Sequence, residues 1–122
     1  MNIELRAQHM ETITDPKAIV IYDMMCDACE KREGGMTDAD QMLCADIARA
    51  EQIKQMCLSD ISDRGLGRER SNGRQRYYAE NKSCSVLRAF TEQQRKCMAE
   101  LKLTPGSRKA AGINLEDDFD NF

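Results

Sequence analysis

The sequence predicts a mainly α-helical protein: a helical hairpin of long helices with a short β-hairpin, assembling into a ring-like homo-oligomer. Two long segments carry apolar residues at the three- and four-residue spacing of helices. Between them lies Asn72-Gly73, the dipeptide most typical of tight β-turns. Leu, Ile, Val and Phe number 8, 8, 2 and 3, together 21 of 122 residues. The core of one chain is therefore small, and contacts between copies are expected to complete it.

Two smaller elements are expected before the long helices. Residues 1–14 are predicted to be an N-terminal arm or a short helix. A helix is then predicted over residues 16–33, because Asp15 is suited to the N-cap and Pro16 to the first helical position. Gly34-Gly35 is expected to end this helix.

The longest helix is predicted over residues 38–63. Thr37 and Asp40 form a variant capping box at its start, with Asp where Glu is usual. The apolar residues of this helix span an arc of about 200° when each residue advances about 100°. One antiparallel neighbour covers only part of such an arc, so we predict contacts between copies. The predicted oligomerisation residues are Leu43, Ile47, Ile53, Met56 and Phe90.

The remaining elements follow from turn and capping residues. A two-stranded hairpin is predicted over residues 66–78, with a type I′ turn at Asn72-Gly73. A last long helix is predicted over residues 82–102. A short helical turn is expected over residues 103–109, capped by Thr104 and with Pro105 at its first position.

The charges of the chain are sorted into three blocks. Residues 1–63 hold 6 Lys/Arg against 13 Asp/Glu, residues 64–109 hold 12 against 4, and residues 110–122 hold none against 4. A basic block of this density is typical of proteins that bind a polyanion. A solvated surface with accidental segregation would give the same counts.

The basic block supplies two sets of candidate DNA contacts. The first set is the hairpin arginines Arg68, Arg70, Arg74 and Arg76. The second is Arg88, Arg95 and Lys102, which recur every seven residues and share one face of the last helix. For this second set, pairing with the acidic first half of a neighbouring copy is an equal alternative.

Catalytic, metal and membrane roles are not expected. The only histidine is His9, so no triad can be assembled, and Gly65-x-Gly67 lacks the Lys and Ser/Thr of a phosphate-binding loop. Cys26 and Cys29 form the only Cys-x-x-Cys. We interpret them as core or surface cysteines in preference to a metal or redox site. The longest uncharged apolar run, residues 18–22, is far shorter than a membrane span. The absence of a signal peptide predicts an intracellular protein.

The order of these elements resembles the small terminase subunit of tailed bacteriophages, in the branch that ends in a Leu-Thr-Pro signature. Residues 36–40, Met-Thr-Asp-Ala-Asp, are similar to the family's Leu-Thr-x-x-Asp opening of the long helix. The Asn-Gly hairpin follows, and then residues 100–108, Glu-Leu-Lys-Leu-Thr-Pro-Gly-Ser-Arg. The resemblance covers about residues 16–109.

The resemblance implies a non-enzymatic packaging factor in the host cytoplasm, without a cofactor. Such subunits form homo-oligomeric rings, bind double-stranded viral DNA at the packaging region, and recruit or regulate the large terminase subunit, an ATPase and nuclease. Only fifteen residues precede Pro16, which leaves no room for a separate helix-turn-helix domain. DNA contact is therefore expected from the basic block, within a helical oligomerisation and DNA-binding domain over residues 15–109.

The acidic C-terminal tail, residues 110–122, is expected to dock onto the large subunit. Apolar residues alternate there with four carboxylates, a pattern typical of segments that order on binding. The predicted docking residues are Leu115, Phe119 and Phe122. The alternative is a solvated tail that screens the basic block. For the whole chain, the alternative functions are a generic helical nucleic-acid-binding regulator and a structural interaction protein.

Overall fold

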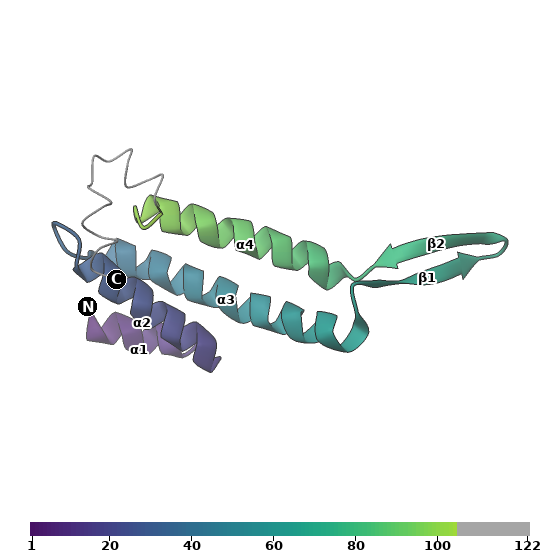
Figure 1. Cartoon of the computed structure of the whole chain (residues 1–122). Helices are drawn as coiled ribbons and strands as arrows, with labels where there is room; N and C mark the ends of the chain where they lie inside the picture. The colour runs from purple at the N-terminus through teal and green to yellow at the C-terminus, as the bar shows by residue number, and fades with distance from the viewer. Residues whose placement is uncertain (105–122) are drawn as a thin grey trace.

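A computed structural model describes residues 1–104 of the chain. The elements are α1 (Ile3–Met10), α2 (Pro16–Glu30), α3 (Asp38–Arg64), β1 (Gly67–Asn72), β2 (Gln75–Glu80) and α4 (Lys82–Glu100). The long helices α3 and α4 run antiparallel, and α1 and α2 pack beside the first half of α3 (Figure 1). The strands β1 and β2 project beyond the end of α3 and the start of α4, away from α1 and α2 (Figure 1). The predicted helical hairpin with a short β-hairpin is confirmed, and its assembly into a ring stays a prediction.

Helix starts follow the predicted capping chemistry. The Asp15 carboxylate accepts a hydrogen bond from the Lys17 amide at 2.8 Å, with Pro16 as the first residue of α2. At the start of α3, Thr37 and Asp40 exchange both hydrogen bonds of the capping box, at 3.0 and 3.2 Å. Each bond satisfies a backbone amide that the helix itself leaves without a partner.

Two helices end earlier than predicted. Helix α2 ends at Glu30 and not at residue 33, because Arg32 leaves the helix and its guanidinium donates to the Asp40 carboxylate at 2.8 Å and the Leu101 carbonyl at 2.5 Å. Helix α4 ends at Glu100 and not at residue 102, because Lys102 adopts a left-handed conformation with φ of 60°. The helical turn predicted over residues 103–109 lies outside the described residues from Pro105 onward.

The turn of the β-hairpin differs from the prediction. Asn72 pairs with Gln75, so the two central residues of the turn are Gly73 and Arg74. Gly73 has φ of 64°, whereas Arg74 keeps a negative φ. A positive φ at the first central position alone is the pattern of a type II′ turn, not the predicted type I′. The one-residue difference arises because a glycine fits the first position of this turn, which leaves Asn72 in the strand.

The core is small and lies away from the β-hairpin, where α1, α2, α3 and the end of α4 meet. Few of its members are large, and alanine and cysteine fill much of it. The fully enclosed residues are Ile13, Ala18, Tyr22, Cys26, Cys29, Cys44, Ala45, Ile47, Ala48 and Leu101. The thin supply of large apolar residues in the sequence is therefore concentrated in one half of the molecule.

A buried polar network fastens α1 to this core. The Tyr22 hydroxyl lies 2.8 Å from His9 Nδ1 and accepts a hydrogen bond from the Gln41 side chain at 2.9 Å. Gln41 also exchanges two hydrogen bonds with the backbone of Asn2, at 2.9 and 3.0 Å. Burial raises the pKa of Tyr22 to about 12, so its proton is available to His9. Burial, together with the charge of Arg49, lowers the pKa of His9.

Acidification should loosen α1. The pKa of His9 is lower in the folded chain than in the unfolded chain, so the unfolded chain binds the proton more readily. Neutral His9 therefore contributes fully to the stability of the fold only above the unfolded pKa of about 6.5. The contribution is lost as the pH falls below that value. We expect the melting temperature to decrease between pH 7.5 and 5.5, and His9→Gln to reduce this dependence. An equal pH dependence in both proteins would contradict the network.

Candidate nucleic-acid interface

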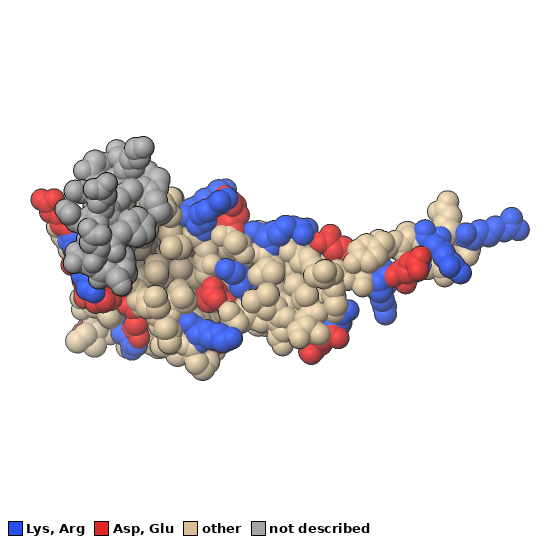
Figure 2. All heavy atoms as spheres, viewed as in Figure 1, with Lys and Arg blue, Asp and Glu red and all other residues tan. Residues whose placement is uncertain are grey.

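The β-hairpin is an exposed projection that does not contribute to the core. Along β1 and β2 every residue is exposed except Gly67 and Ala79, which are half-buried. Figure 2 shows basic side chains along this projection, mostly toward its tip, among acidic and uncharged ones. A two-stranded hairpin with neither face buried is at best marginally stable alone in water. The two strands therefore contribute little to the packing of the described part of the chain.

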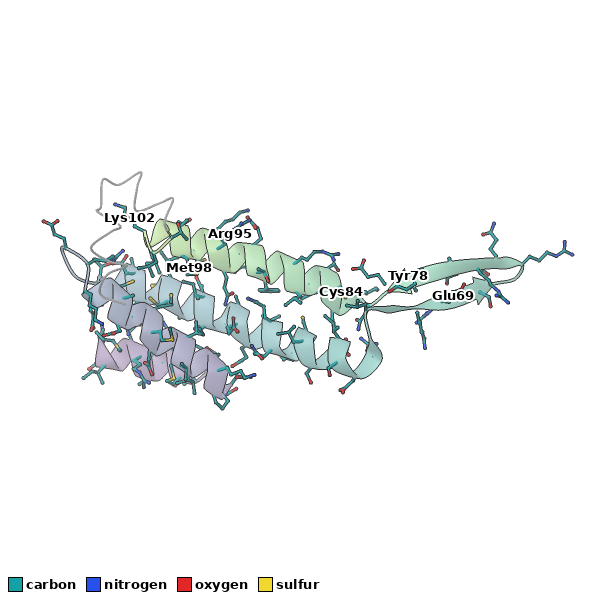
Figure 3. All side chains as sticks on the ribbon, viewed as in Figure 1. Glu69, Tyr78, Cys84, Arg95, Met98 and Lys102 are labelled. Carbon is teal, nitrogen blue, oxygen red and sulfur yellow. The ribbon has the colours of Figure 1, made fainter. Side chains whose placement is uncertain are left out.

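The strand register divides the hairpin into two chemically different faces. Directly opposite residues point to the same side of an antiparallel ribbon. The basic face carries the cross-strand pairs Arg68–Ala79, Arg70–Tyr77 and Asn72–Gln75. The mixed face carries Gly67–Glu80, Glu69–Tyr78 and Ser71–Arg76. Figure 3 labels Glu69 and Tyr78 of the mixed face. Both acidic residues of the strands thus lie on one face, and the other face has none.

The structure brings only some of the predicted DNA contacts together. Arg68 and Arg70 share the basic face, Arg74 lies in the turn, and Arg76 lies on the mixed face. None of these four arginines takes part in an ion pair within residues 1–104. Their guanidinium groups are therefore available to anions.

The predicted contacts on the last helix are placed differently. Arg88 forms an ion pair with Glu80 at 3.1 Å, and Arg95 pairs with Glu92 of its own helix. Arg95 and Lys102 lie toward the end of α4 that is far from the hairpin (Figure 3). The structure therefore does not unite this set with the hairpin arginines.

A concave pocket of about 560 Å³ lies where the hairpin meets the helices. Four cationic residues, Arg64, Arg68, Arg70 and Lys82, line it. Its acidic residue, Glu80, is held by Arg88. The pocket is therefore electropositive, and Lys82 extends the cationic surface from the hairpin onto the first residue of α4.

A hydrogen-bonded junction positions the hairpin on the helices. The Asp60 carboxylate accepts hydrogen bonds from Arg64 at 2.6 and 2.7 Å and from the Ser83 hydroxyl at 2.6 Å. Asn81 caps α4 by accepting from the Ser83 amide and also donates to the Gly65 carbonyl. The hydrogen bonds from Arg64 and Ser83 lower the pKa of Asp60. No role for Asp60 is predicted from the sequence, although its four-residue spacing from Arg64 is that of a helical ion pair.

Gly67 is required by a close approach at the start of β1. A Cβ atom at this position would lie 2.6 Å from the Tyr78 hydroxyl oxygen and from the Ala79 carbonyl oxygen. Both distances are far below van der Waals contact. Tyr78 is thus placed against the base of the ribbon on the mixed face, whereas Tyr77 lies beside Arg70 on the basic face.

Comparison with known protein families decides which family the chain belongs to. A family model described as phage terminase, small subunit, matches residues 18–118. The chain belongs to the phage terminase small-subunit family. The comparisons of this chain with curated proteins and with solved structures found no match. The matched region of this small subunit begins within α2 and includes the complete β-hairpin and α4. The resemblance inferred from residues 36–40, the Asn-Gly hairpin and residues 100–108 is confirmed.

The predicted oligomerisation residues of this small subunit differ in exposure. Ile47 is 1% exposed and packs in the core of its own chain. Leu43, Ile53 and Phe90 are half-buried. Met56 is 67% exposed, and Met42 on the same helix is 57% exposed. Met42 and Met56 are thus exposed on the surface of α3, whereas Ile47 is enclosed in the core of its own chain.

The remaining predictions for this small subunit concern cysteines, tail and membrane. Cys26 and Cys29 are fully buried, and the Cys29 and Cys44 sulfur atoms are 3.9 Å apart. Within residues 1–104 no group of His, Cys, Asp and Glu is arranged to hold a metal ion.

No helix within residues 1–104 is both long and apolar enough to span a bilayer. The docking residues Leu115, Phe119 and Phe122 lie outside the described residues.

Proposed function

We propose that this terminase small subunit binds double-stranded viral DNA through its β-hairpin and recruits or regulates the large ATPase-nuclease subunit during genome packaging. The observation that supports DNA binding most strongly is the projecting hairpin, whose four arginines have no ion-pair partner within residues 1–104. By contrast, Arg6, Arg32, Arg49, Arg64, Arg88 and Arg95 all pair with carboxylates.

The hairpin and its basal pocket carry cationic side chains from base to tip that can contact the DNA backbone. Arg68, Arg70 and Lys82 line the pocket, and Arg74 extends the positive charge to the tip of the hairpin. Each strand has six residues and is therefore about 20 Å long. Such a ribbon can follow a groove of duplex DNA while its basal cations contact the phosphates at the groove's edge.

Assembly would strengthen this interaction. In the proposed ring, exposed apolar residues of α3 such as Met42 and Met56 pack against neighbouring copies. Each copy then presents one hairpin, and several weak hairpin contacts combine into tight binding. We also propose that the acidic tail, with Leu115, Phe119 and Phe122, docks onto the large subunit.

Hydrogen–deuterium exchange of the full chain, with and without duplex DNA at low salt, tests the proposed interface. We expect slower exchange over residues 67–82 in the presence of DNA, because contact excludes water from amides on both strands. Exchange in α1 and α2 should be unchanged and serves as the internal control. Protection confined to α1 and α2 would move the interface away from the hairpin. A protein that ignores DNA at low salt would favour the structural interaction protein instead.

A further inference from the structure

We propose that the basic face of the β-hairpin reads DNA sequence in the major groove, with Asn72 and Gln75 as an adenine-reading pair. This inference rests on the proposed binding of DNA and adds to it a direct contact with base edges. Contacts to phosphates orient a protein on the duplex but carry no sequence information directly, so arginines in the basal pocket do not by themselves distinguish one site from another.

The strand register places Asn72 and Gln75 where a groove-reading pair has to be. They are direct cross-strand partners and the last pair before the turn at Gly73 and Arg74. Both side chains are exposed, and neither side-chain amide makes a hydrogen bond within residues 1–104. The pair lies at the end of the ribbon farthest from the helices (Figure 1). A ribbon whose tip enters a groove therefore brings these two side-chain amides near the bases, together with Arg74 of the turn.

The chemistry of this pair matches adenine. A side-chain amide carries one acceptor and two donors, and Asn or Gln pairs with N6 and N7 of adenine through two hydrogen bonds. The major groove is about 12 Å wide and admits a two-stranded ribbon, whose strands are about 4.8 Å apart. The minor groove is about 6 Å wide and offers a degenerate pattern of donors and acceptors. The width of the ribbon and the amide chemistry therefore both favour the major groove.

The charges on the two faces determine which one meets the bases. The mixed face carries the carboxylate of Glu69, which forms no ion pair within residues 1–104 and which the phosphates lining the groove would repel; Glu80 on the same face is paired with Arg88. The basic face has no acidic residue, and Arg68 and Arg70 on it extend to the basal pocket. One face thus combines phosphate-binding arginines at its base with base-reading amides at its tip.

The test uses a pool of duplex DNA with a randomised central segment and the full-length protein. Wild type should enrich sites that contain adenines at defined positions, with about 5- to 150-fold discrimination at each position contacted through two hydrogen bonds. The double variant Asn72→Ala/Gln75→Ala should lose this discrimination but keep its affinity for the unselected pool within about twofold, because no charge is removed. Ser71→Ala, on the mixed face, is the matched control and should enrich the same sites as wild type.

A second variant guards against local unfolding of the hairpin. Gln75→Glu keeps the size of the side chain but removes its donors, so an adenine preference at one position should change to cytosine, whose amino group donates to a carboxylate. Wild type that binds the pool without enriching any site would overturn the inference and leave the proposed DNA binding intact. The same enriched sites in wild type and the double variant would also overturn it. Failure of wild type to bind the pool would overturn both proposals.

Discussion

Replacing Arg68, Arg70, Arg74 and Arg76 together by Ala should weaken duplex DNA binding on the order of a thousandfold at 0.1 M salt. Four neutralised phosphates make the slope of log affinity against log salt steeper by about 3.6. The affinity that these contacts contribute is therefore large at low salt. The four side chains are exposed and form no ion pair within residues 1–104, so the helical fold should be unchanged. Fluorescence anisotropy with a labelled duplex measures the loss, and circular dichroism checks the helices.

The matched control compares two single variants, Arg70→Ala and Arg95→Ala. Each removes one positive charge from the basic block, but the Arg95 guanidinium pairs with the Glu92 carboxylate of its own helix, whereas Arg70 has no ion-pair partner within residues 1–104. We expect Arg95→Ala to lower the affinity for DNA much less than Arg70→Ala. If the two variants lose affinity equally, total charge and not the hairpin determines binding.

Ile47→Ala should destabilise the chain by about 3 kcal/mol, within the range typical of large-to-small changes in a core. Ile47 is 1% exposed and belongs to a core that contains few other large side chains. A domain of this size has a free energy of unfolding of about 5 to 15 kcal/mol, so this loss is a large part of the total. Urea unfolding followed by helical circular dichroism measures the change.

Met56→Ala on the same helix separates folding from assembly. Its side chain is 67% exposed, so its removal should change the free energy of unfolding of one chain by less than about 0.5 kcal/mol. In native mass spectrometry it should shift the distribution toward smaller species, because the proposed contact between copies is weakened. A Met56→Ala protein that unfolds as easily as Ile47→Ala would contradict the assignment of these two residues to different surfaces.

The sequence was sufficient to predict the helices because their signals are local. The Asp15 cap and the Thr37–Asp40 capping box each join residues that are no more than three positions apart in the sequence. Both form as predicted. The ends of α2 and α4 were not predictable in this way. Arg32 leaves α2 to bind Asp40 and Leu101, and Leu101 is distant in sequence. A contact between segments that are far apart in sequence leaves no periodic pattern.

The hairpin shows the same limit at the candidate site. The Asn-Gly dipeptide correctly predicted two strands, but the turn is shifted by one residue, with Gly73 and Arg74 at its centre. The shift changes which residues belong to the strands: Arg74 moves from the second strand into the turn, and Asn72 joins the first strand on the face of Arg68 and Arg70. Because the side-chain period of a strand is two residues, Arg76 lies on the opposite face with either turn. Lys82 and Asp60 acquire their roles only when the strands and helices meet at the junction.

The salt dependence of duplex binding tests the central claim, that the hairpin arginines bind the DNA backbone, most directly. The slope of log affinity against log salt counts the counterions released when phosphates are neutralised. For each contacting subunit, the account predicts that wild type has a slope steeper by about 3 to 4 than the protein with Arg68, Arg70, Arg74 and Arg76 replaced by Ala. Equal slopes in the two proteins would contradict it, because the phosphates would then be neutralised by other residues.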